Sequence, residues 1–188
     1  MSEQAALTRT SAYVDSGVLI KLYVREPNSA AAAQLVTAFP SVKLYPFQEL
    51  EVRNTLRALA GRTIITAAQR AVAEHEFERD LILGRLRRAV PDWRQVFQVA
   101  LRLSMDHTAA TLARSLDILH VAIAIAEQAD PFITADRRQL EVARREVLRC
   151  MPKAEVRSRI DGTECGTAVF RSERVPGAER GNGGTEAG

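Results

Sequence analysis

Four acidic residues each stand where a hydrophobic segment gives way to a turn or a helix. They are Asp15, Glu51, Asp117 and Asp136. Asp15, for example, directly follows the apolar residues 12–14, so we expect its side chain at the rim of a strand. Carboxylates gathered at such a rim repel one another and are costly to desolvate, so they usually need cations. Hard oxygen ligands of this kind suit Mg²⁺ or Mn²⁺, and their simplest use is metal-assisted attack on a phosphodiester.

Taken one at a time, these acids have simpler explanations. An Asp after a strand, such as Asp15 or Asp136, is more often a helix N-cap than a ligand. Glu51 on an amphipathic helix is more often a solvated residue paired with an arginine such as Arg53. Asp117 differs, because the apolar stretch that follows it shields it from water, and a shielded acid needs a partner.

The elements that must position these acids follow from hydrophobic periodicity and turn residues. Strands are expected over 11–14, 42–45 and 132–134. Helices are expected over 18–23, 30–38, 47–59, 66–83, 92–105, 114–128 and 136–147. Strands that alternate with helices predict an α/β sandwich with a small parallel sheet. In such sheets ligands collect at the carboxyl ends of the strands, where both Asp15 and Asp136 are expected.

Composition narrows the class of protein. The 188 residues suffice for one domain and an appendage, and a hydrophobic fraction of 46% supports a core. No apolar run approaches the roughly 18 residues that span a bilayer, and the first residues lack the features of a secretory signal. Two cysteines are too few for a disulfide framework. We therefore expect a cytoplasmic protein without a membrane segment.

Charge and glycine content divide the chain into three parts. Residues 1–10 are polar and are expected to form a flexible N-terminus, ahead of a single domain over 11–152. Seven of the ten glycines follow Asp161, so 153–188 is expected to be a flexible Gly-rich tail. The tail has six basic and six acidic residues, so the net charge of +3 belongs to residues 1–152. That excess is compatible with a polyanionic substrate.

Four segments form an ordered set around the acids. They are YVDSGVLIKLY (13–23), EVRNTL (51–56), RSLDILHVA (114–122) and FITADRRQ (132–139). In order and spacing they resemble the motifs of PIN-domain ribonucleases, especially the VapC toxins of bacterial toxin–antitoxin pairs. The resemblance covers residues 11–150, and it departs at Gly17, where these proteins more often carry Ser, Thr or Asn. It implies a PIN-like three-layer α/β/α sandwich with a small parallel sheet.

The resemblance implies a Mg²⁺- or Mn²⁺-dependent endoribonuclease whose metal lowers the pKa of a bound water. Its catalytic residues and metal ligands would be Asp15, Glu51, Asp117 and Asp136, with Asp15 and Asp117 as the first choices for direct ligands. Ser16 and Thr134 would hydrogen-bond carboxylates or waters around the metal.

Four further side chains lie close to these acids in the sequence. Arg114, Arg137 and Arg138 are the expected RNA contacts, although each could equally belong to a solvated helix face. His120 lies three residues after Asp117, on the same helix face. It is either a metal ligand or a buried residue that fixes helix packing, and packing is favoured because carboxylates already suffice for a hard cation.

The resemblance also implies two protein partners, a cognate antitoxin and a second copy of the chain in a homodimer. The helices expected at 66–83 and 92–105 would provide the contact surface. Their apolar contact residues would be Val72, Phe77, Leu81, Val96, Val99 and Leu103.

Two other functions stay open at this point. In a phosphatase or phosphotransferase Asp15 would act as a nucleophile, but a haloacid-dehalogenase-like site needs a second Asp where Gly17 stands. Alternatively, a catalytically weakened PIN-like domain would bind RNA or a protein partner without cleavage. Asp15→Asn and Asp117→Asn variants that fold but lose metal-dependent cleavage would exclude this last function.

Overall fold

The structure, a computed structural model, describes residues 11–151. The N-terminal segment expected over 1–10 and the tail expected over 153–188 lie outside the described residues. Within the described part of the chain, no helix is both long and apolar enough to cross a membrane.

Helices and strands alternate along most of this segment. The strands are β1 (Tyr13–Val14), β2 (Val42–Leu44), β3 (Leu86–Arg88), β4 (Phe132–Ile133) and β5 (Cys150–Met151). The helices are α1 (Ser16–Ile20), α2 (Ser29–Thr37), α3 (Pro46–Gly61), α4 (Ala67–Ile82), α5 (Trp93–Thr111), α6 (Ser115–Ala126) and α7 (Arg137–Arg145).

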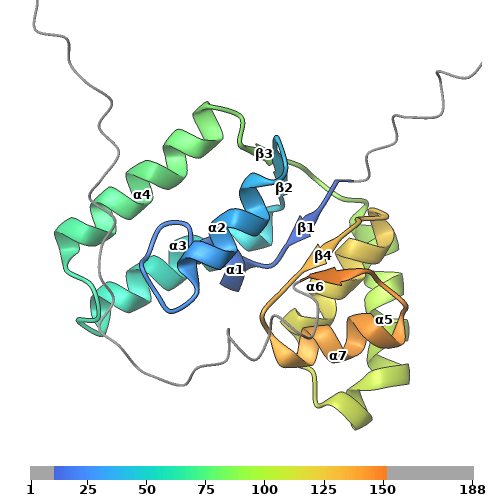
Figure 1. Ribbon diagram of the computed structural model, residues 1–188. Coiled ribbons are helices and arrows are strands. Elements are labelled where there is room, and N and C mark those ends of the chain that lie inside the picture. The colour runs from blue at the N-terminus through green and yellow to red at the C-terminus, as the bar shows by residue number, and fades with distance from the viewer. Residues whose placement is uncertain (1–10, 152–188) are drawn as a thin grey trace, which may run out of the picture.

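All strand pairs are parallel, and they form a three-stranded sheet, β1-β4-β5, and a two-stranded sheet, β2-β3. Tyr13 pairs with Phe132 and Val14 with Ile133. Successive side chains of a strand point to opposite faces. Tyr13 and Phe132 accordingly pack into a core with α5, α6 and α7, and Val14 and Ile133 into a second core with α1 to α4. These helices cover opposite sides of β1 and β4 (Figure 1), which confirms the predicted α/β sandwich.

The largest differences from the sequence-based expectation are two strands and the end of one helix. β3 was not predicted, because only Leu86 of its three residues is buried and the sequence shows no alternation. The strand β3 forms because it pairs with β2. The expected helix over 92–105 continues to Thr111, since neither Gly nor Pro interrupts it, and it ends at Leu112 with a left-handed φ of 53°. The final strand β5 also forms, paired with β4.

The parallel arrangement brings the four acids to one edge. β1 and β4 are neighbours, so the residues that follow them, Asp15 and Asp136, leave the sheet on the same side. Pro46 begins α3 two residues after β2, and this helix carries Glu51. Gln48 of α3 is fully buried and donates a hydrogen bond to the carbonyl of Val14 over 2.8 Å, which ties α3 to the end of β1.

The apolar contact surface expected on α4 and α5 was wrong in part. Phe77, Val96 and Leu103 are fully buried in the core, because they lie on the inner faces of their helices. The exposed apolar side chains of α5 are instead Phe97, Leu101 and Met105. They are spaced four residues apart, so they form one stripe along the outer face of the helix, here called the α5 stripe.

Candidate active site

A pocket of about 320 Å³ lies at the carboxyl ends of β1 and β4, and all four predicted acids line it. Each acid comes from a different element, so the pocket exists only in the folded chain. Its lining consists of Asp15, Ser16, Gly17, Lys21, Glu51, Leu116, Asp117, His120, Ala135, Asp136 and Gln139.

Asp15 is buried, with 4% of its surface exposed, and it precedes α1 at the N-cap position. Its carboxylate makes no capping hydrogen bond. Instead, Oδ1 accepts a hydrogen bond from Gln139 Nε2 over 3.2 Å and lies 3.3 Å from His120 Nε2. The carboxylate is therefore turned towards the pocket, and capping does not explain why an acid stands here.

The Glu51 carboxylate contacts side chains of the pocket and does not pair with a neighbouring arginine. Its Oε2 accepts a hydrogen bond from Ser16 Oγ over 2.8 Å and lies 3.0 Å from His120 Nε2. Arg53 pairs instead with Glu49 and Glu78 on the opposite side of α3.

Asp117 and Asp136 combine a place at the pocket with a capping role. Asp117 Oδ2 accepts a hydrogen bond from the backbone N–H of Arg114 over 2.8 Å. Asp136 Oδ1 accepts from the N–H groups of Arg138 and Gln139, over 2.7 and 3.0 Å. Capping, the simpler explanation for Asp136, therefore holds for one of its oxygens, whereas the capping contact of Asp117 was not expected from the sequence.

His120 is a structural centre of the pocket. It is 1% exposed, its Nδ1 lies 2.8 Å from the hydroxyl of Tyr13, and its Nε2 faces both Asp15 and Glu51. The imidazole thus fixes packing, as the sequence favoured, and also contacts two of the acids. The sequence signal for this second role was its position one helical turn after Asp117.

The two acids that His120 contacts, Asp15 and Glu51, have pKa values shifted in opposite directions. Burial raises the pKa of Asp15 above its usual range, although the His120 charge and the Gln139 hydrogen bond oppose the rise. Burial also acts to raise the pKa of Glu51, but the hydrogen bond and charge of His120 outweigh it and leave that pKa lowered. The difference follows from exposure, since the Glu51 side chain is 24% exposed and that of Asp15 is 5% exposed. Burial acts to lower the pKa of His120, and the two carboxylates reverse this into a net increase.

Gln139 was not recognised as a site residue from the sequence. It is 4% exposed, and its Oε1 accepts a hydrogen bond from Thr134 Oγ1 over 2.9 Å. Thr134 Oγ1 in turn accepts from the backbone N–H of Asp136 over 3.0 Å. A continuous chain of hydrogen bonds therefore joins Asp136 to Asp15. The sequence signal that could have identified it is its spacing. Gln139 lies four residues before Ala143, which places this polar side chain on the buried face of α7.

The missing side chain at Gly17 leaves room for the Asp15 carboxylate. A Cβ atom at Gly17 would lie 3.0 Å from Asp15 Oδ2, at the limit of real contacts. At the position where PIN-domain ribonucleases more often carry Ser, Thr or Asn, glycine therefore lets the Asp15 carboxylate lie close to the backbone.

The sequence pattern and this geometry agree with a comparison against known protein families. Residues 12–145 match the family described as the PIN domain. The chain belongs to the PIN-domain family. PIN domains are generally nucleases and typically metal-dependent ribonucleases. No curated protein matches the chain.

PIN domains generally use divalent metal ions. The donor set of this PIN domain fits such an ion chemically, because four carboxylates supply the hard oxygen ligands that Mg²⁺ and Mn²⁺ prefer. Among residues 11–151, no three Asp, Glu, His or Cys side chains stand together in an arrangement that could hold one ion. His120 contacts Asp15 and Glu51, and backbone N–H groups at the starts of α6 and α7 each contact one oxygen of Asp117 and Asp136.

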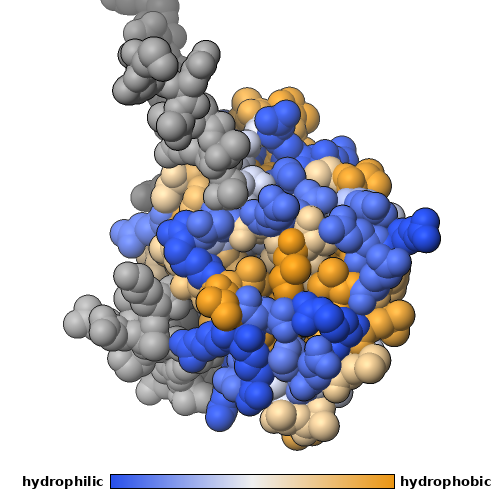
Figure 2. Space-filling view, turned by 90° about the vertical axis from the view of Figure 1, so that its right-hand side faces the viewer, coloured by the Kyte–Doolittle hydropathy of each residue, from blue (hydrophilic) through white to orange (hydrophobic). Residues whose placement is uncertain are grey.

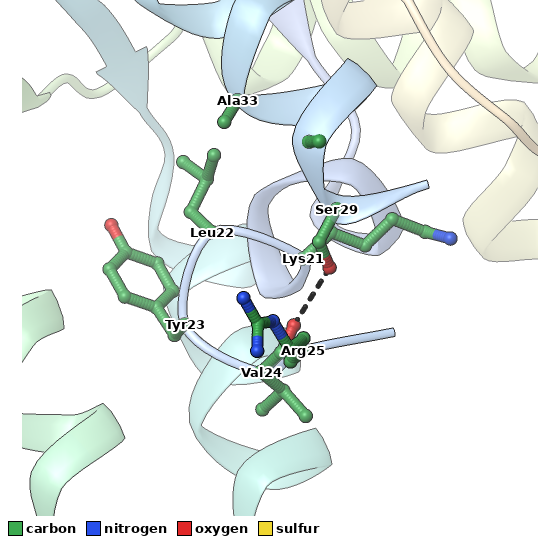
Figure 3. A pocket seen from close by; sticks show the side chains of 8 residues that line it. Lys21, Leu22, Tyr23, Val24, Arg25, Ser29 and Ala33 are labelled. Atoms are coloured by element: carbon green, nitrogen blue, oxygen red, sulfur yellow. Dashed lines mark hydrogen bonds between the residues drawn. The ribbon is translucent and has the colours of Figure 1, made fainter. Parts of the chain in front are cut away.

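The basic residues around the pocket of this PIN domain differ from those expected. Arg114 is exposed at the start of α6, and Arg137 and Arg138 lie in the first turn of α7, but none of the three lines the pocket. Of the lysines and arginines in the described residues, Lys21 alone lines it. Lys21 also lines a neighbouring hollow (Figure 3).

Proposed function

We propose that the protein is a Mg²⁺- or Mn²⁺-dependent endoribonuclease that hydrolyses RNA phosphodiester bonds. The observation that carries the proposal is the convergence of four carboxylates from four elements on one pocket, in a chain of the PIN-domain family. The catalytic residues and metal ligands are then Asp15, Glu51, Asp117 and Asp136.

When bound by these carboxylates, a divalent ion would supply a water of lowered pKa and would neutralise charge on the reacting phosphate. The chain itself orients the ligands. Ser16 holds Glu51 by a hydrogen bond, and Gln139, supported by Thr134, holds Asp15. No side-chain nucleophile is needed, and Arg114, Arg137 and Arg138 bind the RNA backbone outside the pocket.

The test is cleavage of a labelled RNA by the full chain with Mg²⁺, with Mn²⁺ and with a chelator. Asp136→Asn is the sharpest variant, because Asn caps helices as well as Asp does and the fold is kept. Its matched control is Asp92→Asn, since Asp92 caps α5 through the same pair of backbone N–H groups but lies outside the pocket. We expect Asp136→Asn to lose metal-dependent cleavage and Asp92→Asn to keep it. Equal activity of the two variants would contradict the proposal.

One observation favours the competing function, an RNA- or protein-binding domain without cleavage. Two of the four acids serve as helix caps, and no three acids or histidines within residues 11–151 are already arranged around an ion. The same assay separates the two functions, because a non-cleaving domain leaves the labelled RNA intact both with and without metal. A phosphatase with Asp15 as nucleophile is not favoured, since Gly17 provides no second acid.

We further propose that the nuclease is the VapC-type toxin of a toxin–antitoxin pair. The support is the ordered set of four motifs, RSLDILHVA among them. Expression of the chain in a bacterial host is expected to stop growth, whereas the Asp136→Asn variant is expected not to. Co-expression of the short reading frame adjacent to the gene should restore growth if it encodes the antitoxin.

The proposed homodimer uses the α5 stripe. Phe97 is 54%, Leu101 67% and Met105 84% exposed. Figure 2, which views the α5–α7 side, shows apolar side chains gathered within a hydrophilic surface. Exposed apolar patches of this kind mark contact surfaces, and a second copy would cover the stripe by presenting its own.

A further inference from the structure

A second hollow, of about 140 Å³, lies beside the acidic pocket, and Lys21 lines both. It is formed by the loop that follows α1 and by the first half of α2 (Figure 3). Its lining is Lys21, Leu22, Tyr23, Val24, Arg25, Ser29, Ala30 and Ala33. We call it the α1–α2 hollow.

The wall of the α1–α2 hollow is held in place before any ligand arrives. Ser29 Oγ donates a hydrogen bond to the carbonyl of Val24 over 3.0 Å and accepts one from the N–H of Glu26 over 2.9 Å. Lys21 Nζ donates to the carbonyl of Pro27 over 3.1 Å. Three hydrogen bonds thus close the loop onto the start of α2, which lowers the entropy that a ligand would lose on binding.

The positions of the cations indicate on which side of the acidic pocket an RNA strand continues. Four carboxylates line that pocket, and an RNA backbone needs cations on either side of the phosphate that is cleaved. Lys21 is the one lysine or arginine lining it among the described residues, and Arg25 lines the α1–α2 hollow that Lys21 shares. Arg25 is exposed and is paired with no acid in the described part of the chain.

The hollow also has the polarity that a nucleotide requires. Arg25 is exposed, whereas Leu22 and Ala33 are half-buried and Tyr23 is buried; in Figure 3 the Arg25 guanidinium lies near Tyr23, with Leu22 and Ala33 further along the hollow. Cations therefore stand at its rim and apolar side chains at its floor. Single-stranded nucleic acids are held by this combination of cationic contacts to phosphate and apolar contacts to the faces of bases.

We infer that the α1–α2 hollow is a subsite for the nucleotide next to the scissile phosphate of a single-stranded RNA. Arg25 contacts the phosphate of that nucleotide, and the floor around Ala33 contacts its base. Lys21 contacts the backbone between the two pockets. The inference rests on the proposed ribonuclease function, and it places the substrate on the α1–α2 side of the acidic pocket.

Binding in a chelator separates this subsite from catalysis. The probe is a fluorescein-labelled 12-nucleotide single-stranded RNA, measured by fluorescence anisotropy over a series of salt concentrations. Arg25→Ala removes the phosphate contact, so the slope of log K against log salt should become shallower by about 0.7, the value for one contact to a single strand. The matched control is Arg62→Ala, since Arg62 is also exposed and lines neither hollow.

Filling the hollow provides a second measurement that does not depend on charge. Ala30→Phe places a ring at the exposed edge of the hollow and should weaken RNA binding without changing the salt slope. Gln34→Phe is its control, because Gln34 is exposed on the same helix outside the hollow. In cleavage assays with Mn²⁺ and the 12-nucleotide RNA, Arg25→Ala should raise KM and leave kcat unchanged, whereas Arg62→Ala should change neither.

The outcomes for the subsite and for the nuclease are distinct. If Arg25→Ala binds RNA with the affinity and salt slope of Arg62→Ala, the subsite is refuted even where the unaltered chain cleaves RNA. If the unaltered chain binds RNA through Arg25 but never cleaves it with metal, the ribonuclease proposal fails and the binding site stands. Absence of any RNA binding by the unaltered chain refutes the subsite.

Discussion

The hydrogen bond from Gln139 to Asp15 provides the sharpest test of how the site is built. Gln139→Met keeps the length and nearly the volume of the side chain, but it removes both hydrogen bonds that the amide makes. The Asp15 carboxylate loses a donor at 3.2 Å, and the Thr134 hydroxyl loses its acceptor at 2.9 Å. Both partners are buried, with 4% and 1% of their surfaces exposed.

The expected effect on stability follows from these two buried groups. A buried polar group left without a partner costs about 1–3 kcal/mol, and more when it is charged. Asp15 keeps His120 nearby and Thr134 keeps the N–H of Asp136, so neither group is left without contacts. We therefore expect the free energy of unfolding to fall by about 2–3 kcal/mol.

The expected effect on metal binding is larger than this stability loss alone would produce. Residues that orient metal ligands typically contribute about 10–100-fold to metal affinity or activity. Gln139→Met should therefore weaken Mn²⁺ binding by about that factor, measured by isothermal titration calorimetry, and slow RNA cleavage alongside it. It should also raise the pKa of Asp15 further, since the Gln139 hydrogen bond opposes the effect of burial.

Val142→Ala is the matched control for this variant. Val142 is fully buried on the same helix, α7, and lines no part of the acidic pocket. Its truncation should destabilise the fold by about 2 kcal/mol in urea unfolding, through lost burial and a small cavity. If Gln139→Met weakens Mn²⁺ binding no more than Val142→Ala does, Gln139 does not position Asp15 and the reasoning is wrong.

Three further predictions concern other parts of the molecule. The pKa of Asp15 is raised on folding, so the native state holds this proton more tightly and loses stability as pH rises through that pKa. Asp15→Asn should therefore be more stable than the unaltered chain at neutral pH in urea unfolding while lacking cleavage, and a less stable variant would contradict this. Gly17→Ala should slow cleavage and lower the free energy of unfolding, because its Cβ, 3.0 Å from Asp15 Oδ2, displaces this buried carboxylate from Gln139 and His120; cleavage and urea unfolding equal to those of the unaltered chain would contradict this. Leu101→Glu should convert the proposed homodimer to a monomer in light scattering, with RNA cleavage measured as the control for folding. A mass equal to that of the unaltered chain would exclude the α5 stripe as the dimer contact.

Local sequence patterns were enough to predict the class of fold and the position of each acid on its element. Asp15 and Asp136 each follow a buried strand. A short apolar run followed by an acid is a local pattern, and it can be recognised without knowing the rest of the chain. The parallel α/β order then required the two acids to leave the sheet at one edge. Helical periodicity likewise located most of α3, α4 and α6 within a few residues.

Which side chains meet in the pocket depends on the packing of elements that are distant in the chain. Gln139 reaches Asp15 across 124 residues and Tyr13 reaches His120 across 107, and no local pattern encodes such pairs. The same holds for β3, whose three residues become a strand only when β2 lies beside them. Burial on α5 also depends on which face its neighbours cover, and this is why Leu103 is in the core while Leu101 is exposed. Periodicity is a property of adjacent residues, whereas hydrogen-bond partners and buried faces are fixed by the packing of distant elements.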